Sequence, residues 1–189
     1  MSGLRILIDT CVLYPTVMRE VVLGAARAGL FEPIWSERIL EEWARAAIKL
    51  GPEGETQARG EIALLRADWP NSERPAAPGV AQRLWLPDAD DIHVLAVAVD
   101  ASADSIMTLN AKDFPRGILA EEGITRVDPD GFLISLWPQH EASLRDVAAR
   151  ILATAQDLSG KDWEMRSLMK KARLPRLGKA LASGQGEIL

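Results

Sequence analysis

The sequence contains few of the residues on which several common kinds of site are built. Cys11 is the only cysteine among the 189 residues, which excludes an intramolecular disulfide and a zinc site made of cysteines, and a lone thiol fits a reducing compartment. No apolar stretch approaches the roughly 20 residues that span a bilayer, and the N-terminus has no signal-peptide pattern. These absences predict a cytoplasmic protein that does not enter a membrane.

The residues that are present suffice for one ordinary domain with an appendage. Hydrophobic residues make up 48% of the chain, so it can bury a core instead of remaining disordered. The formal net charge is −5, whereas proteins that bind nucleic acids are usually basic. A cluster of metal-binding acids would itself lower the total, so the distribution of charge matters more than its sum.

Apolar runs and helical periodicities alternate along the first three quarters of the chain. Strands are predicted at residues 4–8, 31–35, 105–109 and 124–127, and helices at residues 17–30, behind Ser36, at 55–67, 92–99 and 131–137. The stretch 70–79 has three prolines and is predicted to be a loop. Such alternation indicates an α/β fold with a mostly parallel sheet. We expect one domain over residues 1–138, ended by Pro138, and a helical C-terminal extension over residues 139–189.

Acidic and amide side chains lie where the predicted strands end or where a helix leads into a strand. Ligand sites of parallel sheets form beyond the C-terminal ends of the strands. The side chains concerned are Asp9, Glu42, Asp88, Asp90, Asp91, Asn110 and Asp113. Gathered carboxylates repel one another, and Mg²⁺, which prefers oxygen ligands, would remove that cost. A pair of such ions can activate water and hold a phosphate, and this chemistry needs no histidine in a chain that has only two.

Each acid also has an ordinary structural interpretation. Asp9 could start a turn, and Asp90 could be an N-cap beside a turn residue at Asp88. Asp91 could be an acid in the first turn of a helix, where the helix dipole favours negative charge. Glu42 could lie on a solvated helix face. The joint arrangement of the acids, and no single one of them, predicts a metal site.

Four segments of the chain, in this order, resemble the four motifs of the PIN-domain family. They are Ile6–Leu13, Trp35–Glu42, Asp88–Ala96 and Ala103–Phe114. The resemblance covers about residues 4–138. It implies a three-layer sandwich in which helices flank a mostly parallel sheet of four to five strands. The most similar branch is that of the VapC-like toxins, some of which carry a helical C-terminal extension.

The resemblance also implies a set of site residues. It assigns Asp9, Glu42, Asp91 and Asp113 as the catalytic acids, holding one or two Mg²⁺ or Mn²⁺ ions. The spacing from Ser36 favours Glu42 over Glu41. Many relatives have aspartate where this chain has Asn110, so the fourth acid is placed at Asp113. Three further side chains are expected to orient the acids or a metal-bound water, and these are Thr10, Thr108 and Asn110.

The activity implied by the resemblance is metal-dependent hydrolysis of RNA within the strand, leaving 5′-phosphate and 3′-hydroxyl ends. Such proteins are toxins of bacterial type II toxin–antitoxin pairs, are held inactive by a cognate antitoxin and are commonly homodimers. A structure-specific DNA nuclease and a non-catalytic binding module on the same fold are the alternatives. A phosphatase of the haloacid dehalogenase type is disfavoured, because it needs an aspartate where Cys11 stands.

A run of basic residues in the C-terminal extension has no acid between its first and last members. A surface of this kind would bind phosphates, and Trp163 just before it could stack on a base. The alternatives are a solvated basic helix or a surface for an acidic partner. The candidate RNA-binding residues are Arg166, Lys170, Lys171, Arg173, Arg176 and Lys179.

Overall fold

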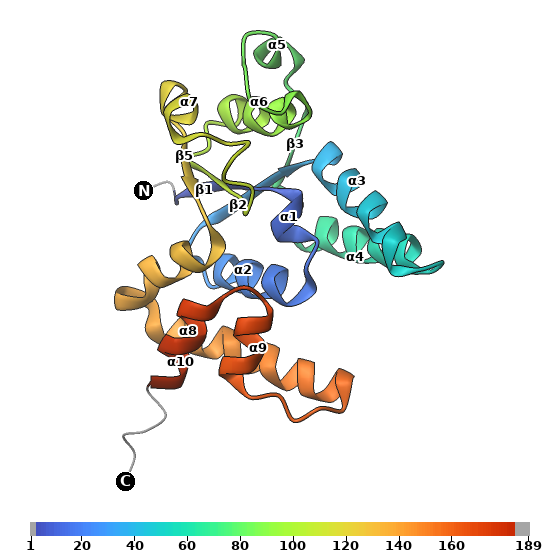
Figure 1. The fold of residues 1–189 in the computed structure, drawn as a ribbon, viewed down its shortest axis with the longest axis vertical. Coiled ribbons are helices and arrows are strands. Elements are labelled where there is room, and N and C mark those ends of the chain that lie inside the picture. Colours follow the sequence, from blue (N-terminus) through green and yellow to red (C-terminus); the bar gives the residue numbers. More distant parts are fainter. Residues whose placement is uncertain (1–2, 184–189) are drawn as a thin grey trace. The chain divides into compact units, whose positions relative to one another are not determined.

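The computed structural model of the chain describes residues 3–183. These residues form two compact units (Figure 1). The first comprises Met1–Tyr14 and Phe31–Val127, and the second Pro15–Leu30 and Asp128–Leu189. No helix in residues 3–183 has the length and apolarity needed to cross a bilayer.

The first unit is built on a five-stranded sheet in which all neighbouring strands are parallel, so the predicted α/β fold is confirmed. The strand order is β3-β2-β1-β4-β5. The strands are β1 (Arg5–Ile8), β2 (Glu32–Ser36), β3 (Glu73–Arg74), β4 (Ser105–Met107) and β5 (Thr125–Val127). Residues 6–8 of the central strand are fully buried. Because the strands run in one direction, the residues that follow them gather at one edge of the sheet.

The remaining elements of the first unit are helices, of which α3 and α4 are the longest. They are α1 (Thr10–Leu13), α3 (Glu37–Ala46), η1 (Ala47–Leu50), α4 (Gly54–Asp68), α5 (Pro78–Ala81), η2 (Ala89–Asp91), α6 (Ile92–Asp100) and α7 (Arg116–Glu121). The apolar helix α6 packs on β1, β2 and β4, and its residues 94–98 are buried. Helix α3 begins where predicted, because the Ser36 side chain accepts a hydrogen bond from the backbone N–H of Ile39 at 3.4 Å.

The prediction of a loop over residues 70–79 was wrong for β3. This strand is only two residues long, both charged, and it lies at the edge of the sheet. Its pairing with β2 is extended by a hydrogen bond from the backbone N–H of Trp35 to the carbonyl of Ser72. Prolines are tolerated beside an edge strand, because no second neighbour requires their missing N–H groups.

The second unit consists of helices only. They are α2 (Thr16–Arg27), α8 (Pro129–Ser159), α9 (Met165–Lys171) and α10 (Pro175–Ser183). The helix predicted over residues 131–137 is followed closely by an interruption of α8. His140, two residues after Pro138, has a non-helical φ of −133° and ψ of 25°, and a second helical segment continues from this kink to Ser159. The expected domain boundary at 138 therefore falls inside α8, whereas the compact units change at Val127 and Asp128.

Helix α2 approaches α8 closely at Gly24. A Cβ added to Gly24 would lie 2.5 Å from Cγ1 of Val147, which is buried and stiff at χ1. We expect Gly24→Ala to lower the free energy of unfolding by about 1–2 kcal/mol, measured by urea denaturation. The matched control is Gly60→Ala in α4, where an added Cβ meets nothing within 4 Å and should stabilise by roughly 0.5 kcal/mol. Equal effects of the two substitutions would contradict this prediction.

Helix α10 begins at a carboxylate supplied by another helix. Asp130, in the first turn of α8, is 7% exposed and accepts two backbone hydrogen bonds, from Arg176 and from Leu177, each at 2.9 Å. The N–H groups of a first helical turn have no partner within their own helix. Asp130 therefore ties the start of α10 to the start of α8.

Candidate functional site

Asp9 lies directly beyond β1, at the C-terminal edge of the sheet. Its backbone N–H donates to the carbonyl of Met107, which ends the neighbouring strand β4. Its carboxylate is 7% exposed and accepts two hydrogen bonds on Oδ2, from the Thr108 hydroxyl at 2.7 Å and from the Cys11 thiol at 3.1 Å. In the described residues no hydrogen bond reaches Oδ1, so this oxygen is free to bind a cation.

Cys11 acts on Asp9 as a neutral thiol. Burial and the negative charge of Asp9 raise the pKa of Cys11 to about 12, so the thiol stays protonated at neutral pH. The protonated thiol donates a hydrogen bond to the Asp9 carboxylate. The same sulfur accepts a hydrogen bond from the backbone N–H of Leu109 at 3.2 Å. The only cysteine of the chain thus joins α1 to the loop behind β4 and is not a reactive nucleophile.

Three further carboxylates form a group that we call the acidic cluster, made of Asp88, Asp91 and Asp113. One oxygen from each lies within 4.8 Å of the others. The short 3₁₀ turn η2 brings Asp88 and Asp91 together, because residues three apart eclipse one another in that geometry. Asp88 also caps the turn by accepting from the backbone N–H of Asp90 at 2.9 Å, so the N-cap interpretation applied to the wrong residue.

The charges of the acidic cluster act on one another and on Asp9. Burial, followed by the charges of Asp9, Asp88 and Asp113, raises the pKa of Asp91 to about 6. Asn110 partly offsets this repulsion, since its amide lies 3.5 Å from Oδ2 of Asp91, at the limit of a hydrogen bond. The carboxylates at this end of the sheet therefore repel one another at close range.

Asp113 is held in place by a residue of the neighbouring strand. Arg126 in β5 donates to the backbone carbonyls of Ala111 and Phe114, on either side of Asp113. Phe114 is fully buried and anchors the same loop. The loop behind β4 is therefore fixed at two points, and Asp113 is carried between them.

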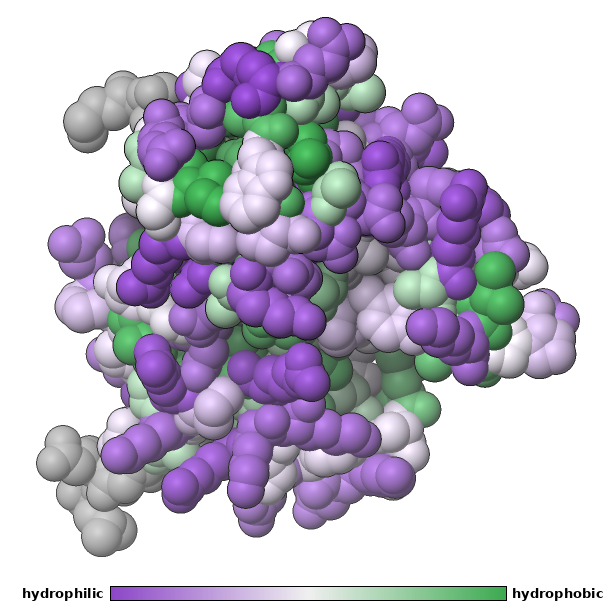
Figure 2. Space-filling view, turned by 45° about the horizontal axis from the view of Figure 1, so that its top comes forward, coloured by the Kyte–Doolittle hydropathy of each residue, from purple (hydrophilic) through white to green (hydrophobic). Residues whose placement is uncertain are grey.

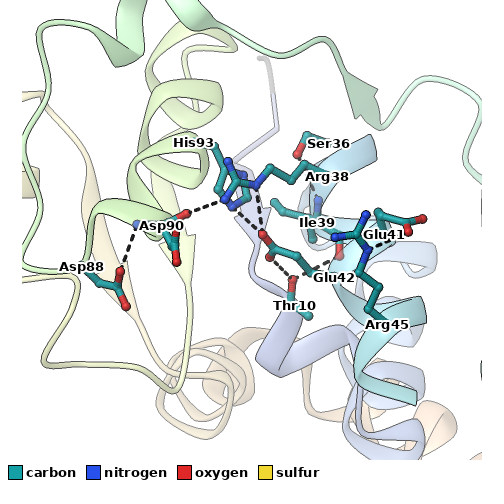
Figure 3. Close-up of polar contacts among 10 residues, drawn as sticks. All are labelled: Thr10, Ser36, Arg38, Ile39, Glu41, Glu42, Arg45, Asp88, Asp90 and His93. Carbon is teal, nitrogen blue, oxygen red and sulfur yellow. Dashed lines mark hydrogen bonds and ion pairs between the residues drawn. The ribbon is translucent and has the colours of Figure 1, made fainter. Parts of the chain in front are cut away.

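Glu42 occupies a separate place at the edge of the site, and Figure 3 shows its partners. One oxygen accepts from the Thr10 hydroxyl at 3.0 Å, and the other lies 3.2 Å from Nε of Arg38 and 2.9 Å from Nε2 of His93. Although burial acts against it, the close contact with His93 and the hydrogen bonds from Thr10 and Arg38 lower the pKa of Glu42 below its ordinary value. Glu42 is thus ionised and its charge is already paired.

The neighbouring Glu41 points away from these groups (Figure 3). It binds Arg45 at 2.9 Å and Arg59 at 2.9 Å on the exposed surface, and these two arginines lower its pKa to about 2. Glu42, by contrast, reaches Thr10, the residue next to Asp9. The geometry of α3 therefore turns Glu42 rather than Glu41 towards the site.

The structure brings together Asp91 and Asp113, with Asp9 close enough to shift the pKa of Asp91, while Glu42 stays with Arg38 and His93. Sequence reasoning counted Asp88 among the acids near the strand ends, with a turn as its alternative role, but did not assign it to the metal site. The spacing of three residues between Asp88 and Asp91 was the signal that could have placed it in the cluster. The roles of His93, Cys11 and Arg126 had no such signal, because each depends on contacts with another segment of the chain. The same holds for the hydrogen bond from Arg38 to the carbonyl of Asp90.

The acidic cluster has the chemistry of a divalent-cation site. Its members offer carboxylate oxygens, which Mg²⁺ and Mn²⁺ prefer, and their mutual repulsion raises the pKa of Asp91. Asp9 offers its unbonded Oδ1 from the adjoining strand end. The residues at this edge of the sheet therefore fit one or two such ions.

We expect Thr108→Val to weaken Mn²⁺ binding about tenfold, because the Thr108 hydroxyl orients the Asp9 carboxylate. The dissociation constant can be measured by isothermal titration calorimetry of metal-free protein. Thr125→Val is the control, since that hydroxyl bonds Ser105 and the carbonyl of Asp104 at the other end of β4. An equal affinity in wild type and Thr108→Val would show that Asp9 needs no such orientation.

The six basic residues of the C-terminal extension lie in the second unit, on α9, α10 and the turn between them, and all are exposed. Within the described part of the chain none of them makes an ion pair. Lys171 lies over the ring of Trp163, 4.9 Å from its centroid. This helical pair therefore presents uncompensated positive charge to solvent.

Comparison with known proteins gives one match. A family model described as "PIN domain" covers residues 5–112, which is more than half of the chain. That range includes Asp9, Glu42, Asp88 and Asp91 and ends just before Asp113. No curated protein and no solved structure matches the chain.

Proposed function

The chain belongs to the PIN-domain family, a family of metal-dependent nucleases, and from that premise we propose that it is an Mg²⁺- or Mn²⁺-dependent endoribonuclease. The observation that carries the proposal is the meeting of Asp88, Asp91 and Asp113 beside Asp9 at the C-terminal edge of a parallel sheet. RNA as the substrate is supported by the resemblance of the four motifs to VapC-like toxins.

Asp9, Asp91 and Asp113 would hold the cation, and Asp88 joins them because it lies in the same cluster. Glu42 would join only by exchanging Arg38 and His93 for the cation. A divalent ion at this place supplies Lewis acidity, which lowers the pKa of a bound water and offsets charge on the phosphate.

The side chains around the acids set their orientation. Thr108 and Cys11 hold one oxygen of Asp9 and leave the other available to a cation. Thr10 links Glu42 to the carbonyl of Ile39, at 3.1 Å, and so fixes where that acid stands. A site built in this way places its charge before the substrate arrives, which is how electrostatic catalysis avoids a cost of reorganisation.

The first test is cleavage of defined RNA and of matched single- and double-stranded DNA with Mg²⁺, with Mn²⁺ and with EDTA. Metal-dependent cleavage of RNA that leaves 5′-phosphate ends and is lost in Asp9→Asn would support the proposal. Cleavage of DNA alone would favour the structure-specific DNA nuclease. Metal binding without cleavage of any substrate would favour a non-catalytic module, and cleavage in EDTA would overturn the metal-dependent mechanism.

We further propose that the protein is the toxin of a bacterial type II pair, acting in the cytoplasm, neutralised by a cognate antitoxin and able to form a homodimer. This is supported only by the resemblance to VapC-like toxins. Induced expression should stop growth, the Asp9→Asn variant should not, and co-expression of the antitoxin should restore growth. Growth that continues despite active RNA cleavage in the cell would contradict the role as a toxin.

The basic residues of α9 and α10 are proposed to bind the RNA backbone. Their exposure and lack of acidic partners support this. The logarithm of the affinity for RNA falls linearly with the logarithm of the salt concentration, and each phosphate contact contributes about one unit to the slope of this line. Replacing Lys170 and Lys171 with alanine should therefore lower that slope by roughly 2 units. An unchanged slope would assign this surface to another partner.

A further inference from the structure

A groove opens in the first unit beside the acidic site. It has a volume of about 840 Å³ and lies among the C-terminal ends of β2 and β3, the start of α3, and helices α5 and α6. Its lining includes Trp69, Pro75, Pro78, Ala96, Arg74 and His93. The volume is in the range of pockets that bind small organic groups. Figure 2 shows hydrophobic residues among hydrophilic ones on the face where α5 and α6 come forward.

The groove is continuous with the acidic site through two residues that belong to both. Arg38 lines the groove, and its guanidinium donates to the carbonyl of Asp90 at 3.1 Å and pairs with Glu42. His93 also lines the groove and lies 2.9 Å from Glu42, two residues after Asp91 on the chain. Figure 3 shows Arg38 and His93 both reaching Glu42. The groove therefore begins at the residues that contact Glu42.

The floor of the groove suits a flat ring. Trp69 is half-buried, and its indole meets the fully buried Trp35 edge to face, with ring centroids 6.5 Å apart and an angle of 83°. This contact fixes the plane of Trp69. Aromatic side chains held in this way are the surfaces on which unstacked bases of single-stranded RNA stack.

Two arginines of the groove differ in their partners. Arg66 is held by both oxygens of Glu73, at 2.6 and 2.9 Å. Within residues 3–183 the side chain of Arg74 makes no hydrogen bond or ion pair, and its Nε is shielded from solvent. A buried donor without an acceptor is unfavourable, so an acceptor from a bound ligand would stabilise the Nε–H group of Arg74. Guanidinium groups bind phosphates and the edges of bases.

We propose that this groove receives one nucleoside of the RNA strand, adjacent to the phosphate that is cut. Its base stacks on Trp69, and Arg74 donates to an acceptor on that base or on its own phosphate. The inference rests on the proposed ribonuclease activity and adds to it a subsite that reads the strand beside the cut.

The test is steady-state cleavage of one RNA that the wild type cuts, compared with copies in which a single base next to the cut is removed. Loss of one base should raise KM about tenfold in the wild type, because stacking of that base is lost. Trp69→Ala should raise KM by a similar factor for the intact RNA. The same variant should show no further rise when that base is absent.

Arg74→Ala is the second variant, because Trp69→Ala removes a ring that packs on the core, and Arg74 has no partner to lose. It should raise KM several-fold. The controls are Trp85→Ala, at a tryptophan that is 65% exposed and outside the groove, and Lys49→Ala, at an exposed lysine outside it. Neither control should change KM or the effect of the missing base.

The outcomes separate this inference from the proposed function. The subsite would be overturned if the wild type cleaves RNA and loss of the base raises KM by the same factor in the wild type and in both groove variants. The proposed ribonuclease activity would then still stand. An equal rise of KM in the groove variants and the controls would also overturn it. Failure of the wild type to cleave RNA would overturn the proposed function first, and the subsite with it.

Discussion

In the absence of metal, the Asp91→Asn variant should unfold at a higher temperature than the wild type, and saturating Mg²⁺ should reverse that order. Burial and the charges of Asp9, Asp88 and Asp113 raise the pKa of Asp91 to about 6, so its ionised form is unfavourable in the folded protein. Asparagine keeps the shape without the charge. Because Asp91 is half-buried and screened by solvent, we expect a gain of only about 1 kcal/mol without metal.

The pH dependence of this difference has a definite sign. The pKa of Asp91 is higher in the folded state than its ordinary value of 3.8, so the folded state binds the proton more tightly. The cost of ionising Asp91 is therefore fully present above about pH 6 and disappears as the pH falls towards about pH 4. In EDTA the difference in unfolding temperature between Asp91→Asn and the wild type should shrink as the pH falls from about 6 to about 4, as differential scanning calorimetry can record. A difference that does not change with pH would contradict this prediction.

The same substitution should lower RNA cleavage by at least roughly 100-fold, since it removes an oxygen ligand from the proposed cation site. Asp90→Asn is the matched control, because Asp90 is exposed, lies outside the acidic cluster and bonds through its backbone. It should keep most of the activity. Full activity in Asp91→Asn would remove Asp91 from the mechanism.

Asp130→Ala should destabilise the second unit by about 3 kcal/mol, the largest effect on stability that we expect from a single substitution. The change leaves the backbone N–H of Leu177 buried without an acceptor and that of Arg176 without its charged partner. Urea denaturation gives the free energy, and hydrogen exchange should show faster exchange across α10.

Asp130→Asn separates the charge from the acceptor. The amide oxygen can accept one of the two hydrogen bonds, so the loss should be about half as large. Asp157→Ala, at an exposed aspartate near the end of α8, should be within about 0.5 kcal/mol of the wild type. A loss in Asp130→Ala no greater than in Asp157→Ala would show that α10 does not depend on this cap.

Sequence patterns were sufficient for the strands whose side chains are buried. Residues 4–8 and 105–109 are mostly apolar stretches of the right length, and β1 and β4 lie within them. The strand β3 could not be found in this way, because its two charged residues follow no alternation and are held by hydrogen bonding to β2. The predicted end of a helix at Pro138 lies within two residues of the kink at His140, where the helical φ and ψ of α8 are interrupted.

The candidate site was predictable to the same degree. The position of Asp9, Asp91 and Asp113 at one edge follows from the parallel direction of β1 and β4. What the sequence could not provide is the balance of charge at that edge. The pairing of Glu42 with Arg38 follows the i, i+4 spacing within α3. The contact of Glu42 with His93, by contrast, depends on how α3 and α6 lie beside each other, and periodicity along one helix does not contain this.

The packing of α2 on α8 also bears on how the chain emerges from the ribosome. The buried face of α2 includes Val21, Val22 and Ala25, yet its partner in the unit begins about 100 residues later, at Pro129. During synthesis this apolar face therefore stays without its native partner until most of the chain has been made. A nascent chain stalled before α8 thus presents an exposed hydrophobic helix, which is the feature that chaperones bind and that promotes aggregation.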